Sequence, residues 1–198
     1  RQLEAVAPDR VVADIPYLTL AAAAQIGIPA RAICCLNWAE IFHFYCADAP
    51  GAAAIHAQMV TAYNQAETFF STEPAMPMPC LTRRVEVGPI ARSGTNRRAA
   101  IAAAIGLGES ERLVLVAMGG IATRLPLAQW PKLAGIRWLI QGDGQTLRED
   151  MIDPATLGIH YRDLQASCDL LLTKPGYGAF TEAVMNGIPV LYITRDDW

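Results

Sequence analysis

Residues 169–182 read Asp-Leu-Leu-Leu-Thr-Lys-Pro-Gly-Tyr-Gly-Ala-Phe-Thr-Glu, and they are the strongest indication of the fold in the sequence. An apolar run comes first and a turn with Gly176 and Gly178 follows it; a helix-like stretch (183–187) then leads to a second apolar run, 189–193. This order of strand, glycine-rich turn, helix and strand is typical of α/β proteins. Such a turn leaves backbone N–H groups free at the start of a helix, where the helix dipole favours an anion.

The residues alone leave two interpretations of this turn open. Without Cβ atoms at Gly176 and Gly178, a phosphate can approach the backbone closely. Glu182 lies one helical turn further on, where a carboxylate could take two hydroxyls of a sugar. The alternative is a plain tight connection with Glu182 as a first-turn acid, and the glycines by themselves favour that alternative.

The order of residues adds a resemblance. The pattern Asp-x-x-x-Thr-Lys-Pro-Gly-x-Gly-x-x-Thr-Glu-Ala, then Gly-Ile-Pro-Val-Leu and an Arg-Asp pair, resembles the donor-nucleotide motif of GT-B glycosyltransferases of the family-28 and UDP-glycosyltransferase type. In that family the glycine turn faces the donor diphosphate. The resemblance therefore implies that Gly176, Gly178 and Thr181 lie near phosphate or sugar. It also implies that Glu182 binds ribose.

The resemblance also implies that three further segments belong to the donor-binding site. GT-B enzymes carry a glycine loop at the start of the donor domain, which corresponds here to the segment from Gly119-Gly120 to Thr123. The donor base would rest near His160 and Tyr161, although Tyr161 packing on a helix beside a solvated His160 is an equal alternative. The pair that follows the last strand would hold hydroxyls of the donor sugar; it consists of Arg195 and Asp196.

The first part of the chain resembles a GT-B subgroup that also occurs as an N-terminal part of some sugar kinases, through an Asp-x-Pro segment and a second segment that departs from the subgroup's Asn-x-x-Trp, because Trp38 directly follows Asn37. The resemblance places Asp14, Asn37 and Glu40 near the acceptor, and Asp14 is a fallback candidate for the general base. The alternative has Asp14 capping the helix that starts at Tyr17. For Trp38 we expect a place in the core.

The chain predicts two α/β halves. In the first we expect helices at 1–7, 17–25, 38–46 and 52–68 and strands at 10–14, 30–36, 69–72 and 85–89. In the second we expect helices at 97–105, 126–132 and 161–168 and strands at 113–118 and 136–141. Residues 90–96 are polar and turn-rich, so we predict a partial acceptor-side domain at 1–92 and a donor-binding domain at 93–198. The fold class is two Rossmann-like halves with parallel sheets, the N-terminal half incomplete and the C-terminus truncated.

Composition narrows the function classes. The 198 residues are 53% hydrophobic and 18% charged, which suits buried parallel strands and excludes disorder. A net charge of −3 without a basic block argues against nucleic acid as a partner. No run approaches the length of a membrane span. The five cysteines form no disulfide framework and no zinc spacing with the histidines, which favours a cytoplasmic location and no metal site.

The function that the resemblance implies is transfer of a sugar from a nucleotide-diphosphate donor, by analogy a UDP-sugar, to the hydroxyl of an unknown acceptor. Helix N-termini and glycine-loop amides would stabilise the leaving diphosphate without a metal or an organic cofactor. Two alternatives stay open: a sugar-nucleotide 2-epimerase of the same fold, and a non-catalytic domain that binds a nucleotide sugar.

Overall fold

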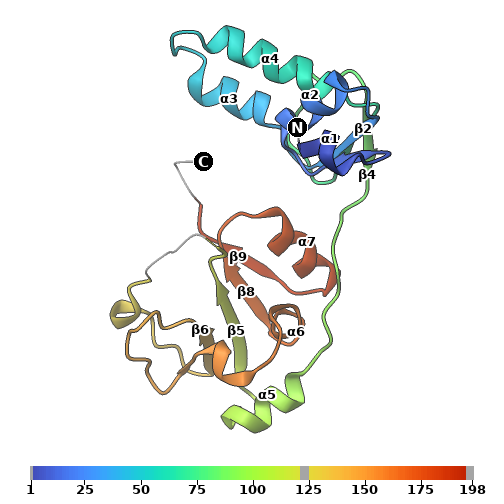
Figure 1. Ribbon diagram of the computed structural model, residues 1–198. Helices are drawn as coiled ribbons and strands as arrows, with labels where there is room; N and C mark the ends of the chain where they lie inside the picture. Colours follow the sequence, from blue (N-terminus) through green and yellow to red (C-terminus); the bar gives the residue numbers. More distant parts are fainter. Residues whose placement is uncertain (1, 121–124, 195–198) are drawn as a thin grey trace. The chain divides into compact units, whose positions relative to one another are not determined.

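A computed structural model describes residues 2–120 and 125–194, so Thr123, Arg195 and Asp196 lie outside the described residues. The chain divides into two compact units, residues 1–90 and 91–198. Each unit has its own parallel sheet and its own helices (Figure 1). The predicted fold class, two Rossmann-like halves with parallel sheets, is confirmed.

The first unit is a four-stranded parallel sheet in the order β1-β2-β3-β4. Its strands are β1 (Val11–Ala13), β2 (Ala30–Cys34), β3 (Phe69–Thr72) and β4 (Arg84–Val87), and its helices are α1 (Gln2–Val6), α2 (Tyr17–Gln25), α3 (Trp38–Cys46) and α4 (Ala52–Asn64). These elements match the predicted ranges closely, except that α4 ends before the predicted residue 68. The helices α3 and α4 run side by side as a hairpin (Figure 1).

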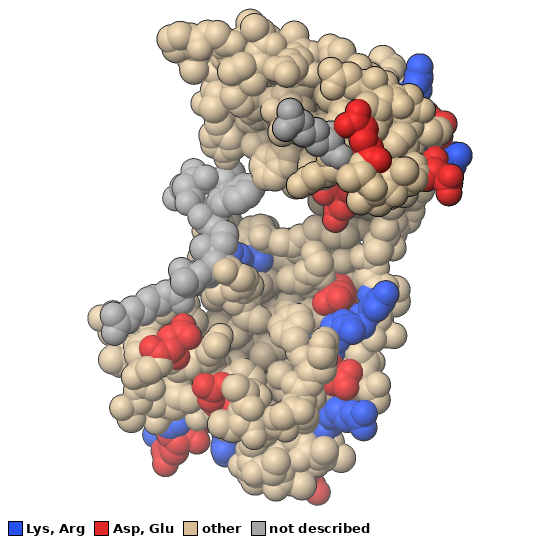
Figure 2. Space-filling view, in the orientation of Figure 1, with Lys and Arg blue, Asp and Glu red and all other residues tan. Residues whose placement is uncertain are grey.

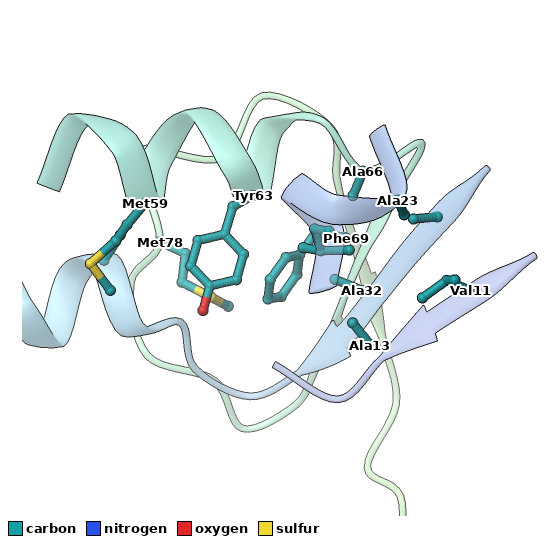
Figure 3. Close-up of a cluster of buried hydrophobic side chains, with 12 residues drawn as sticks. Val11, Ala13, Ala23, Ala32, Met59, Tyr63, Ala66, Phe69 and Met78 are labelled. Carbon is teal, nitrogen blue, oxygen red and sulfur yellow. The ribbon is translucent and has the colours of Figure 1, made fainter. Parts of the chain in front are cut away.

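The core of the first unit gathers around Tyr63 of α4, whose ring packs against Phe69 of β3 near Met59 and Met78 (Figure 3). The tyrosine is only 1% exposed. Its hydroxyl donates to the carbonyl of Ile15 (2.8 Å) and accepts the N–H of Trp38 (3.1 Å). Ile15 has a φ of 83°, which is strained for a β-branched residue. The hydroxyl therefore ties together the segments that follow β1 and β2.

Replacing Tyr63 by Phe should destabilise the first unit by about 1 kcal/mol, because two part-buried backbone groups lose their hydrogen-bond partner. The shift of the urea unfolding midpoint measures this loss. Tyr45→Phe is the matched control, since that side chain is 53% exposed and should tolerate the change. Equal midpoints for the two variants would contradict the role given to the Tyr63 hydroxyl.

The second unit is a five-stranded parallel sheet in the order β7-β6-β5-β8-β9. Its strands are β5 (Arg112–Ala117), β6 (Ile136–Ile140), β7 (Met151–Ile152), β8 (Leu170–Thr173) and β9 (Val190–Tyr192). Its helices are α5 (Arg98–Ile105), α6 (Tyr161–Gln165) and α7 (Tyr177–Met185), with short 3₁₀ turns η1 (Leu127–Gln129) and η2 (Pro154–Leu157). On the face shown in Figure 2, acidic and basic side chains of this unit lie interspersed.

The structure corrects several predicted boundaries. Helix α7 begins at Tyr177, well before the predicted 183–187, so Gly178 lies inside the helix. The buried Ala183 packs this helix on the sheet and offsets the low helix propensity of the glycine. The predicted helix at 126–132 is only the short η1, because prolines flank it, and α6 ends before residue 168 so that the chain can enter β8. The two-residue β7 was not predicted.

Asp169 joins the starts of β5 and β8. Its carboxylate accepts the N–H of Leu113 (2.7 Å) and one N–H each from Arg98 (2.6 Å) and Arg112 (3.1 Å). Partial burial by itself would raise the pKa of this carboxyl, but the hydrogen bonds outweigh that effect and lower it from the ordinary value of 3.8. The charged form therefore stabilises the fold.

Asp169→Asn should cost about 2 kcal/mol of stability at neutral pH, the size of a hydrogen-bonded charge. Because the folded-state pKa is lowered, this contribution is complete above the ordinary pKa and is lost as the pH falls through the folded value. The midpoint gap between wild type and variant should thus begin to narrow below about pH 4 and close as the pH falls through the lower folded-state pKa. Glu149→Gln, which alters an exposed pair with Lys132, is the control. A gap that does not change with pH would refute the charge-based account.

Candidate functional site

A cavity of about 970 Å³ opens at the carboxyl edge of the second sheet, where β5 and β8 end. Ligands of open α/β sheets bind at this edge, and the volume is in the range of small-molecule sites. Much of the lining is apolar and comes from β5, from loops and from α6: Leu115, Val116, Met118, Leu125, Pro154, Tyr161 and Leu164. The turn 174–176 and the first turn of α7 also line the cavity.

The first turn of α7 offers N–H groups to a ligand. Its N-cap is Gly176, which has no side chain to accept from them. Gly178 also lines the cavity, and a Cβ atom at either glycine would meet nothing closer than the Lys174 carbonyl at 4.0 Å from the Gly176 position. The helix N-terminus, with its partial positive charge, therefore faces open space that an anion can occupy.

Lys174 adds a full positive charge beside this helix end. Its Cε atom lies 3.5 Å from the position that a Cβ on Gly119 would take. Gly119 has a φ of +69°, a conformation that favours glycine. Among the described residues Lys174 has no carboxylate within salt-bridge distance. Both Lys174 and Gly119-Gly120 line the cavity, so the lysine stem crosses the glycine loop towards the site.

A side-chain hydrogen bond joins the ends of the two central strands, β5 and β8, beside the cavity. The Thr173 hydroxyl, 2% exposed, donates to the carbonyl of Ala117 at 2.6 Å and contacts the Lys174 carbonyl at 3.2 Å. This bond lies one residue before Lys174 and two residues before Gly119, both of which line the cavity.

Tyr161 lines the cavity from the start of α6. Burial of much of its side chain, followed by the negative charge of Glu182, raises the pKa of the tyrosine to about 12. The hydroxyl is therefore protonated at neutral pH. His160 is exposed and caps α6, with Nδ1 accepting the N–H of Arg162 at 3.3 Å, and it does not line the cavity.

Two other residues of α7 that the sequence predicted for the site, Glu182 and Thr181, differ in burial and in their contacts. Glu182 is half-buried in the second turn, on the same helix face as Gly178, and its charge acts on Tyr161. Thr181 is buried, and its hydroxyl bonds within the helix to the carbonyls of Tyr177 (2.9 Å) and Gly178 (3.3 Å). Neither of them lines the cavity directly.

The structure adds residues to the site that the sequence interpretation did not choose. Lys174 is the most important of them, and the loop after β6 adds Gln141 and Asp143. The sequence carried a usable signal for these residues, since Lys174 and Gln141 directly follow a buried strand and Asp143 lies two residues beyond Gln141, all at the carboxyl edge of the sheet.

In the first unit Asp14 is exposed at the end of β1 and does not cap α2, whose N-cap is Pro16 without a side-chain bond. The capping alternative for Asp14 is therefore wrong. Asn37 is fully buried and caps α3 by accepting the N–H of Glu40 at 2.9 Å. Trp38 is 40% exposed, so the expectation that it fills the core is also wrong.

Comparison with known protein-family profiles finds no match. Among curated proteins the chain is similar to L-arabinokinase of Arabidopsis thaliana, with 26% identity over 203 residues that cover 98% of this chain and 19% of that protein. The chain thus spans about a fifth of the length of this relative.

Solved glycosyltransferases share the fold of this chain. Spinosyn forosaminyltransferase SpnP matches with a TM-score of 0.59 and 14% identity, over 100% of this chain and 59% of that one. The glycotransferase of kitacinnamycin matches with a TM-score of 0.58 and 16% identity, over 98% and 60% of the two chains. UGT2 of Phytolacca americana, solved with UDP-2-fluoro-glucose and pterostilbene, matches with a TM-score of 0.50 and 18% identity, over 90% and 54%. The chain therefore has the fold of GT-B glycosyltransferases.

Proposed function

We propose that the cavity of the second unit binds the diphosphate of a nucleotide sugar and that the protein transfers the sugar to an acceptor hydroxyl. The observation that carries this proposal is the convergence of Lys174, the Gly119-Gly120 loop and the N-terminus of α7 on one cavity. A lysine and helix N–H groups together favour a group with more than one negative charge.

The same groups account for the chemistry of a glycosyl transfer. As the bond between sugar and diphosphate breaks, negative charge grows on the leaving diphosphate. The ammonium of Lys174 and the N–H groups of α7 are fixed beside the place where that charge develops, which lowers the barrier. We propose that this replaces a metal ion. On the first unit we propose the exposed carboxylate of Asp14 as the base that takes the acceptor proton.

Uracil is the proposed base, because UGT2 of Phytolacca americana, which shares the fold, was solved with UDP-2-fluoro-glucose. The uracil ring would lie against the apolar lining beside Tyr161, and the ribose of the nucleotide would reach Glu182 along the face of α7 that Gly178 begins. The cytoplasmic location stays a prediction that rests on the cysteine pattern. Among the described residues no helix has the length and apolar character needed to cross a membrane.

A second candidate is a non-catalytic domain that binds a nucleotide sugar. The match to L-arabinokinase favours it, because nearly the whole of this chain corresponds to a fifth of a protein named for a kinase activity. Release of UDP from a UDP-sugar in the presence of acceptors distinguishes the candidates. A transferase releases UDP, a binding domain releases none, and a 2-epimerase returns a changed sugar.

Calorimetric titration of UDP, GDP and TDP into the protein tests the donor site. We expect UDP to bind and Glu182→Ala to weaken it by about 1–3 kcal/mol, the cost of lost hydrogen bonds to ribose. Glu109→Ala, a change in the loop after α5, is the control and should bind UDP as the wild type does. Absence of binding by all three nucleotides would overturn the proposal, whereas equal affinity of Glu182→Ala and wild type would remove only the ribose role.

A further inference from the structure

The segment that leads into the second unit is bonded to both helices that wall the cavity. We call residues 94–97 the strap. Its backbone N–H groups donate to side-chain oxygens: Gly94 to Asn186 Oδ1 (3.0 Å), Thr95 to Asp163 Oδ1 (2.8 Å) and Arg97 to Ser167 Oγ (2.7 Å). Asp163 belongs to α6 and Ser167 follows it, while Asn186 is the C-cap of α7. The strap therefore bridges α6 and α7.

Close contact with α6 makes a glycine necessary at position 94. A Cβ atom there would lie 2.1 Å from the carbonyl oxygen of Arg162, 2.5 Å from its carbonyl carbon and 3.0 Å from the Cβ of Ala166. The first two atoms are backbone, which cannot rotate away as the end of a flexible side chain can. Only a glycine allows the strap to lie directly on α6.

Helix α6 depends on such outside contacts. It has 5 residues, far fewer than a helix needs to be stable by itself. Its direct link to α7 is the buried Gln165, whose Nε2 donates to the carbonyl of Ala179 at 3.1 Å. Tyr161 and Leu164 of α6 and Ala179 of α7 all line the cavity. The spacing of the two helices thus sets the width of the cavity.

We propose that the strap positions α6 against α7 and so sets the affinity of the cavity for a nucleotide, with Asp163 and Asn186 as positioning residues that touch no ligand. This inference rests on the proposed function, because it concerns the same cavity. By thermodynamic linkage, a nucleotide that prefers the strapped arrangement must in turn stabilise the strap. The backbone N–H groups of residues 94, 95 and 97 report on that arrangement directly.

The first test compares UDP affinity in Gly94→Ala and Gly88→Ala. Position 88 lies upstream of the strap, and a Cβ atom there meets nothing within 4 Å. We expect Gly94→Ala to bind UDP about tenfold more weakly, a usual size of coupling between two sites, and Gly88→Ala to bind it as the wild type does. Equal affinities for the two variants would overturn the role of the strap.

A second comparison separates positioning from mere loss of stability. Asp163→Asn keeps an oxygen for the Thr95 N–H and should keep the affinity, whereas Asp163→Ala should lose it as Gly94→Ala does. Asp150→Asn weakens the pair with Arg148 (2.9 Å) directly before β7 in the same unit, so it should lower stability and leave UDP affinity unchanged. If Asp150→Asn weakened UDP as much as Gly94→Ala, general destabilisation would explain the effect and the proposal would fall.

Hydrogen exchange of the strap amides completes the test. UDP should slow exchange at residues 94, 95 and 97 in the wild type, although these residues do not line the cavity. Unchanged exchange at saturating UDP would refute the coupling while leaving the donor site intact. Failure of UDP, GDP and TDP to bind the wild type would instead overturn the proposed function, and the strap inference with it.

Discussion

Replacing Lys174 by Met should weaken UDP binding about 10- to 100-fold, which corresponds to the loss of one charge-assisted contact to phosphate. Methionine keeps the length and apolar character of the lysine stem that passes Gly119, so the glycine loop should keep its shape. The lost contact is electrostatic. The affinity of the wild type should therefore depend on salt concentration more strongly than the affinity of the variant does. Calorimetric titration at low and high salt measures both effects.

The chain supplies its own control for this prediction, because Lys132 and Lys174 are its only lysines. Lys132 is exposed and pairs with Glu149 at 2.9 Å, away from the cavity lining. Lys132→Met should bind UDP as the wild type does. Acetylation with mass spectrometry gives an independent reading of the same site, since UDP should protect Lys174 and leave Lys132 reactive. Equal protection of the two lysines would show that the ammonium of Lys174 does not face the nucleotide.

The fold could be predicted from the sequence because apolar runs and turn residues mark the ends of most strands and helices. The ranges of α2 and α3 were predicted to the residue, and in both cases an apolar strand and a turn precede the helix. The site was less accessible to prediction. Helix α7 was expected at 183–187, whereas it begins at Tyr177, after the extended N-cap Gly176, and the buried Ala183 packs it on the sheet despite the low helix propensity of Gly178.

The choice of site residues shows a second limit. A motif names residue types in order, but it does not say which side chains face the cavity. Thr181 belongs to the motif, but its hydroxyl donates a hydrogen bond to the Tyr177 carbonyl within α7. Lys174 was interpreted only as part of the turn, and it lines the cavity. Trp38 was expected in the core and is 40% exposed, whereas the neighbouring Ala39 is fully buried. Orientation of this kind depends on tertiary packing, which no local pattern contains.

Gly178→Leu should abolish measurable UDP binding while it raises the stability of the second unit. The new side chain has room, since a Cβ atom at this position meets nothing within 4 Å, and that room is the cavity itself. A leucine in place of a glycine in a helix stabilises it by about 0.5–1 kcal/mol. Opposite signs of the two effects exclude misfolding as the cause of lost binding.

Side chains of increasing size at position 178 test this prediction more closely. Gly178→Ala should share the gain in stability but fill little of the cavity, so its loss of UDP affinity should be much smaller than that of the leucine variant. Val184→Leu, on an exposed surface of the same helix, should change neither property much. Urea unfolding and UDP titration on the same samples give both quantities. If Gly178→Leu bound UDP like the wild type, the nucleotide would not lie against the first turn of α7, because a leucine there and a diphosphate cannot occupy the same space.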